Sequence, residues 1–143
     1  GLGDLDWARH LLFVAEGKGR KQRWVPMGEE AEVWLQEYLA RGRPALAREH
    51  AETVFLSRTG RPLGVSQLAV IVSRWGQHVG LAKHVTPHCL RHSCATHMLK
   101  RGANLKHLQT LLGHESIQTT QSYTRVELSD LRQVLRRCHP RER

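Results

Sequence analysis

The stretch His88 to His97, HCLRHSCATH, gathers side chains that can bind a metal, an anion or a reacting phosphate. It contains three histidines, two cysteines and an arginine. A zinc site needs its ligands to converge on one ion. On a helix with about 100° between successive residues, Cys89 and Cys94 point roughly 140° apart, so this set does not converge. We therefore predict no metal site, and we interpret both cysteines as small, partly buried helix residues.

His88 and Arg91 form a different combination within the same stretch. They are three residues apart, so on a helix their side chains share one face. They also lie near a helix start, because Thr86 and Pro87 are typical of an N-cap and a first helical position. A helix N-terminus, a guanidinium and an imidazole together suit an anionic oxygen. The alternative is a surface pair with no shared task.

Further reactive side chains lie on both sides of this pair. His114 lies in LLGH, Tyr123 follows nine residues later, and Lys18 lies upstream in GKGRKQ. A free tyrosine has a pKa of about 10, so its attack on a phosphodiester needs a group that takes the proton or stabilises the charge. The acidic residues near these motifs are scattered and predict no magnesium cluster. A covalent protein nucleophile fits the residues that are present.

In order and spacing, these motifs resemble the catalytic domain of the tyrosine recombinases, the phage-integrase and Xer-like site-specific recombinases. The resemblance is carried by GDLDW, GKGRKQRWVPMG, TPHCLRHSCATHMLKRGANLKHLQTLLGHESIQTTQSYTRV and the closing CHPRER, which together span nearly the whole chain. It implies an enzyme that cleaves and rejoins DNA through a 3′-phosphotyrosyl intermediate, without a metal or other cofactor.

The resemblance also implies catalytic roles for individual side chains. Tyr123 matches the nucleophile. Arg91 matches the second arginine of the family's pair and would hold the non-bridging oxygens as negative charge builds. His88 would assist proton transfer at the nucleophile.

Two further roles follow from the same resemblance. His114 would donate a hydrogen bond to a phosphate oxygen. Lys18 would protonate the departing 5′-oxygen. Lys21 is close enough to be the matching lysine instead, and the sequence leaves this choice open.

Part of the family pattern is not found in the sequence. The first catalytic arginine and a following glutamate would lie shortly before Gly1, and the N-terminal DNA-clamping domain would lie earlier still. We therefore interpret residues 1–143 as a fragment of a catalytic domain. We expect this fragment alone to bind DNA weakly and to cleave it poorly or not at all.

The charge of the chain favours double-stranded DNA as its partner. Lysines and arginines number 22 against 13 acidic residues, a net charge of +9, and such an excess predicts a polyanionic partner. Aromatic residues make up only 6%, which disfavours a stacking platform for single strands. No apolar run is long enough to span a membrane, and we expect a cytoplasmic protein. The predicted phosphate contacts are Arg20, Lys21, Arg23, Lys100, Arg101 and Lys106.

The elements that would position these residues predict an α+β fold, with a small antiparallel sheet near the N-terminus beside a mostly helical body. Apolar runs at 10–15 and 23–27 predict a hairpin, and 53–57 predicts a third strand. Periodicity and caps predict helices over 28–44, 66–80 with Ser66 as N-cap, 87–102, 104–113, 116–126 and 127–138.

Two other functional classes stay open at this point. The segment THMLKRGANLKHLQTLLGH has two short helices around a glycine, as a non-enzymatic helix-turn-helix DNA-binding protein would. A type IB topoisomerase shares the tyrosine chemistry, but the Xer-like CHPRER favours recombination.

The C-terminal helix carries a prediction about assembly. Leu128, Leu131, Leu135 and Cys138 form an apolar stripe. One interpretation is that the stripe folds back onto its own core. The other, implied by the resemblance, is that it packs into a neighbouring protomer within a tetramer on DNA.

Overall fold

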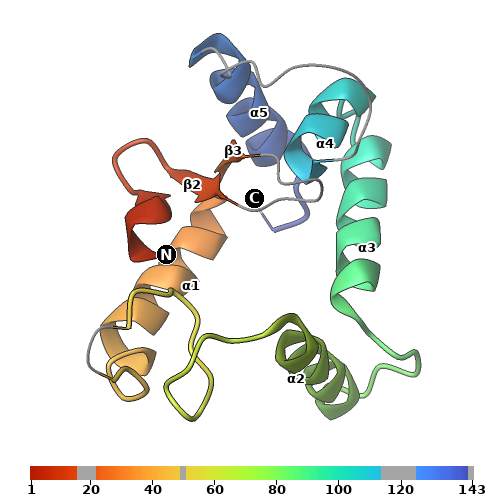
Figure 1. The fold of residues 1–143 in the computed structure, drawn as a ribbon. Helices are drawn as coiled ribbons and strands as arrows, with labels where there is room; N and C mark the ends of the chain where they lie inside the picture. The colour runs from red at the N-terminus through yellow and green to blue at the C-terminus, as the bar shows by residue number, and fades with distance from the viewer. Residues whose placement is uncertain (16–21, 49–50, 114–124, 142–143) are drawn as a thin grey trace.

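A small sheet and a cluster of helices form the fold (Figure 1). The structure, a computed structural model, describes residues 1–15, 22–48, 51–113 and 125–141, and for 125–129 the backbone alone. The elements are η1 (Leu2–Asp4), β1 (Leu5–Asp6), β2 (Leu11–Val14), β3 (Arg23–Pro26), α1 (Glu29–Glu37), the π-helical η3 (Tyr38–Gly42), α2 (Val65–His78), α3 (Pro87–Lys100), α4 (Leu105–Leu112) and α5 (Arg125–Cys138). The predicted α+β class is confirmed.

The sheet is antiparallel in the order β1-β2-β3. Phe13 on β2 pairs with Trp24 on β3, and their ring centroids lie 5.0 Å apart. Pro26 ends β3 at the edge of the sheet, where its missing N–H costs no ladder bond. The two predicted hairpin strands are therefore confirmed.

The predicted third strand at 53–57 is wrong. That stretch makes only an isolated bridge, from Leu56 to Pro62, and the third strand is β1 instead. Other groups satisfy the backbone here. The Arg43 guanidinium donates to the Thr53 carbonyl at 3.0–3.1 Å, and the Leu56 N–H donates to the Tyr38 hydroxyl at 3.1 Å. Backbone groups paired in this way need no strand partner.

Helix α1 follows the predicted helix but buries a different face. Trp34, one of the periodic apolar residues of this helix, is 64% exposed, whereas Glu32 is only 8% exposed. The cause is an ion pair, because His10 Nδ1 lies 2.7 Å from a Glu32 carboxylate oxygen. His10 has the positive φ of 57° in the turn before β2. This pair connects α1 to the sheet.

Helix α2 begins two residues earlier than predicted, with Gly64 rather than Ser66 as its N-cap. The reason is the Gln67 side chain, which accepts a hydrogen bond from the Gly64 N–H at 3.0 Å and so satisfies an N-terminal donor. Its apolar stripe is largely exposed to solvent, as Trp75 at 63% illustrates. In Figure 1, α2 lies apart from the sheet and continues through a loop into α3.

The core of the helical body lies between α3, α4 and α5, which pack against one another (Figure 1). Met98 on α3 is fully buried and contacts residues from the two neighbouring helices. The core residues are Met98, Ala103, Leu108, Leu135 and Cys138. Leu131, Leu135 and Cys138 are buried in their own chain, as the first interpretation of the C-terminal stripe predicts. Leu128 lies outside the described side chains.

The ion pair of His10 and Glu32 predicts a difference in stability. Glu32→Ala removes a nearly buried carboxylate and leaves the His10 imidazole without that partner, so we expect a loss of about 1–3 kcal/mol. Glu37→Ala is the matched control, because the pair of Glu37 with Arg41 is exposed and such pairs contribute about 0–1 kcal/mol. Urea unfolding measures both. Equal losses in the two variants would contradict the role of the pair.

Candidate active site

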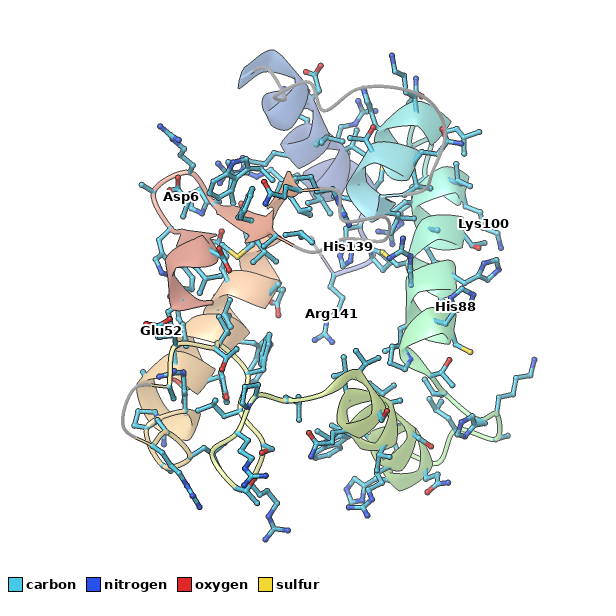
Figure 2. The ribbon with its side chains drawn as sticks, in the orientation of Figure 1. Asp6, Glu52, His88, Lys100, His139 and Arg141 are labelled. Carbon is cyan, nitrogen blue, oxygen red and sulfur yellow. The ribbon has the colours of Figure 1, made fainter. Side chains whose placement is uncertain are left out.

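The first turn of α3 presents the predicted His–Arg pair. Thr86 is the N-cap and accepts a hydrogen bond from the Cys89 N–H at 3.2 Å, and Pro87 occupies the first turn, as the sequence predicts. His88 and Arg91 follow at helical spacing, and both are exposed. Figure 2 shows His88 at this end of α3. An exposed imidazole and guanidinium beside a helix N-terminus can receive an anionic oxygen.

Arg91 also joins two helices. One Nη of its guanidinium donates to the carbonyl of Leu112, the last residue of α4. Carbonyls in the last turn of a helix have no intrahelical partner and carry the negative end of the helix dipole, so a guanidinium suits this position. The guanidinium has several further N–H donors. Arg91 can therefore hold the end of α4 and bind an anion at the same time.

Arg23, which we predicted as a phosphate contact, lies at the same end of α4. A β carbon on Gly113 would lie 2.6 Å from Arg23 Cζ, so this guanidinium packs directly against the glycine. Arg23 Nε is buried and has no hydrogen-bond partner among the residues that the structure describes. Two guanidinium groups therefore approach the adjacent residues Leu112 and Gly113. Sequence analysis did not find this convergence, because the partners come from β3, α3 and α4.

The other predicted catalytic residues, Lys18, His114 and Tyr123, lie outside the described residues. The same holds for Arg20 and Lys21, two of the predicted phosphate contacts.

The remaining predicted phosphate contacts are exposed but lie at the other end of α3. Lys100 ends that helix (Figure 2), Arg101 follows it, and Lys106 lies in the first turn of α4. At about 1.5 Å per residue, Lys100 is roughly 18 Å along the axis from His88. The Arg101 guanidinium donates to the His139 carbonyl at 2.9 Å, so it also fastens the end of α5. Lys100, Arg101 and Lys106 therefore belong to a basic surface at the other end of α3 and are not part of the site formed by His88 and Arg91.

The two cysteines of α3 differ from each other in environment. Cys94 is half-buried, with its sulfur 3.8 Å from that of Met98, as expected for a packing residue. Cys89 is exposed, so its predicted partial burial is wrong. It lies in the first turn of α3, where its sulfur is hydrogen-bonded to the Thr86 hydroxyl. Within the described ranges, no group of three or more potential ligands could hold a metal ion.

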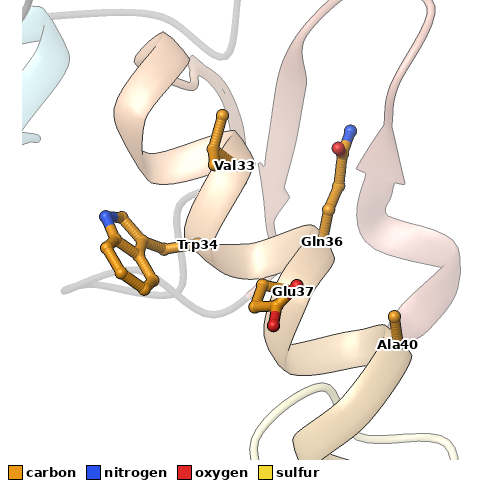
Figure 3. Close-up of a pocket in the computed structure, with 5 residues that line it drawn as sticks. All are labelled: Val33, Trp34, Gln36, Glu37 and Ala40. Carbon is orange, nitrogen blue, oxygen red and sulfur yellow. The ribbon is translucent and has the colours of Figure 1, made fainter.

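Two hollows lie away from the His–Arg pair. One of about 530 Å³ runs along one face of α1, between Val33 and Ala40, and Figure 3 shows its lining. It contains the Trp34 and Glu37 side chains but no combination suited to phosphate chemistry. A second, of about 250 Å³, lies between α4 and α5. Among the described helices, none is long and apolar enough to cross a membrane.

An exposed His–Arg pair at a helix N-terminus, a second arginine nearby and a basic surface define a protein suited to a polyanion. Comparison with known proteins makes the class specific. The model of the phage integrase family matches residues 1–129. The chain belongs to the phage integrase family.

Curated relatives carry recombinase names. The chain is 45% identical to tyrosine recombinase XerD of Corynebacterium glutamicum, over 87% of the chain and 41% of that protein. It is 43% identical to tyrosine recombinase XerC of Oceanobacillus iheyensis, over 98% of the chain and 47% of that protein. The chain thus spans less than half the length of these relatives.

Solved structures support the same family. The crystal structure of XerA recombinase aligns with a TM-score of 0.72 at 34% identity, covering 98% of this chain and 50% of that one. The XerH site-specific recombinase, solved with a palindromic difH substrate as a post-cleavage complex, aligns with a TM-score of 0.59 at 30% identity, over 74% of this chain and 30% of that one.

The environment of Cys89 predicts selective thiol chemistry beside the His–Arg pair. The Thr86 hydroxyl, hydrogen-bonded to the sulfur, lowers the pKa of the Cys89 thiol, whereas burial raises the pKa of the Cys94 thiol. More Cys89 is therefore thiolate at neutral pH, and thiolate is the reactive form. We expect iodoacetamide to label Cys89 first at pH 7, as measured by peptide mass spectrometry.

The unfolded chain is the control for this experiment, because all its thiols are then equally accessible. Equal labelling rates for Cys89 and Cys94 in the folded chain would contradict the environments described above.

Proposed function

We propose that the chain is the catalytic part of a site-specific recombinase that cleaves and rejoins double-stranded DNA. The observation that carries the proposal is the position of Arg91, exposed beside His88 and bonded to the end of α4 two residues before His114, in a member of the phage integrase family. Tyr123 is the proposed nucleophile. Proteins of similar sequence are named tyrosine recombinases, which supports the same chemistry.

The proposed reaction exchanges one phosphodiester for another. The Tyr123 oxygen bonds to phosphorus, its proton passes toward His88, and the bond from phosphorus to the 5′-oxygen breaks. Arg91 stabilises the charge on the non-bridging oxygens, a contribution of about 3–4 kcal/mol for a preorganised donor. Attack by a 5′-hydroxyl on the phosphotyrosine reverses these steps, so ligation needs no added energy source.

The remaining roles complete the proton transfers. His114 donates to a phosphate oxygen, and Lys18, or Lys21 in its place, gives a proton to the departing 5′-oxygen. No step in this scheme requires a metal or other cofactor. The proposed phosphate contacts are Lys100, Arg101 and Lys106, with Arg20 and Lys21.

The proposed enzyme is larger than this chain. The relatives are more than twice as long, which supports a first catalytic arginine and a DNA-clamping domain supplied by further sequence. We keep a tetramer on DNA, acting in the cytoplasm, as part of the proposal. Because Leu131, Leu135 and Cys138 are buried within one chain, assembly through α5 would require these contacts to be exchanged between protomers.

A covalent adduct tests the proposed chemistry. The natural polypeptide that carries this sequence is incubated with a pool of nicked duplexes of random sequence. Cleavage near the nick releases a short strand with a 5′-hydroxyl, and because this strand diffuses away, the DNA cannot be religated. We expect adducts resistant to sodium dodecyl sulfate from the wild type and none from Tyr123→Phe. Arg91→Ala should lower their rate of formation by about 10²–10³-fold.

The outcomes separate the functional classes. Adducts that persist in Tyr123→Phe would contradict the assignment of the nucleophile. If the wild type and all variants bind DNA but none forms an adduct, the helix-turn-helix alternative is favoured. Relaxation of supercoiled plasmid without strand exchange between sites would favour the topoisomerase.

The basic surface gives a second prediction, which the chain itself can test. If Lys106 neutralises a phosphate, Lys106→Gln should reduce the slope of log affinity against log salt by about one. Arg41→Gln is the control, because Arg41 lies in η3, which follows α1, and is exposed in a pair with Glu37. Fluorescence anisotropy with a labelled duplex measures both. Equal slopes for Lys106→Gln and wild type would remove Lys106 from the interface.

A further inference from the structure

We infer that Arg23 is a positioning residue, which holds the end of α4 so that the Leu112 carbonyl can orient Arg91. This inference rests on the proposed function, in which Arg91 binds the reacting phosphate. It replaces the prediction that Arg23 is a direct phosphate contact.

The first support is the contact between Arg23 and Gly113. Gly113 has a φ of 68° and ends α4 in the left-handed conformation, and its Cα faces the Arg23 guanidinium so closely that a β carbon would lie 2.6 Å from Cζ and 2.7 Å from one Nη. The glycine is required for its backbone conformation, and the Arg23 guanidinium fills the space beside its Cα. The guanidinium in turn limits the movement of Gly113.

The second support is the adjacency of the two arginine contacts. Arg23 packs on Gly113, and Arg91 donates to the carbonyl of Leu112, the preceding residue. The peptide plane between Leu112 and Gly113 includes that carbonyl. A shift of Gly113 therefore turns the acceptor of Arg91. Both positive groups also lie at the negative end of the α4 dipole, which favours them there.

The third support is the environment of the Arg23 side chain. Its Nε is buried and has no partner among the described residues, and its Cζ faces protein backbone. A guanidinium that contacts DNA presents its edge to a phosphate, whereas much of this one is covered by the chain.

Adduct formation by the natural polypeptide tests the inference. The duplex is the one enriched by the wild type from the random pool, and single-turnover rates are measured for Arg23→Met, Arg23→Lys and the control Arg41→Met. We expect Arg23→Met to slow adduct formation by about tenfold or more, with Arg23→Lys in between and the control unchanged. Duplex affinity should stay within about twofold, with the same salt slope. A slope reduced by about one would overturn the inference and restore a phosphate contact.

A double variant distinguishes positioning from a general structural role. If Arg23 acts through Arg91, then Arg23→Met combined with Arg91→Ala should be no slower than Arg91→Ala alone. Losses that multiply would show that the two residues act independently and would overturn the inference.

A measurement without DNA separates this inference from the proposed function. In NMR of the 143-residue chain, exchange of the Arg91 guanidinium hydrogens should be faster in Arg23→Met than in wild type, and unchanged in Arg41→Met. Unchanged exchange in Arg23→Met overturns the inference, whatever the enzyme does. If the wild type forms no adducts but exchange is faster in Arg23→Met, the proposed function is overturned. The coupling of Arg23 to Arg91 is then still supported.

Discussion

The arrangement of the candidate site depends on one hydrogen bond, from the Arg91 guanidinium on α3 to the Leu112 carbonyl at the end of α4. Beneath it, Met98 and Leu108 fix the distance between the two helices through buried contacts. The core alone would tolerate small rotations of either helix. The hydrogen bond from the Arg91 guanidinium fixes the orientation of the two helices, because the unpaired carbonyls at a helix end point in one direction only. The same contact keeps one edge of the guanidinium away from solvent and leaves the rest for an anion.

Local signals in the sequence predicted those elements whose ends are determined by nearby residues. Thr86 and Pro87 begin α3, and Asn104 and Gly113 delimit α4, because caps and left-handed glycines act within a single turn. The same reasoning failed where a distant group decides the outcome. At 53–57 the predicted strand is replaced by a turn, in which the Arg43 and Tyr38 side chains and the backbone of residues 61–63 satisfy the backbone. α1 buries Glu32 because His10, more than twenty residues earlier, pairs with it.

The candidate site divides in the same way. The spacing of His88 and Arg91 and the helix start before them were enough to predict a pair on one face near a helix N-terminus. In the structure both residues lie there and are exposed. Arg23 was predicted from its charge alone, and charge does not reveal that a side chain packs against a glycine from another element. The contact between the Arg23 guanidinium and Gly113 is visible only once the fold brings β3 beside the end of α4.

The central claim is that Arg91 neutralises charge on the non-bridging oxygens of one phosphate. The most direct measurement compares Arg91→Ala with wild type on two duplexes that differ only in the scissile group, a phosphate or an uncharged methylphosphonate. We expect the deficit of Arg91→Ala in adduct formation to shrink by about tenfold or more on the methylphosphonate, because this group carries one negative charge less for Arg91 to stabilise. An equal deficit on both duplexes would contradict it.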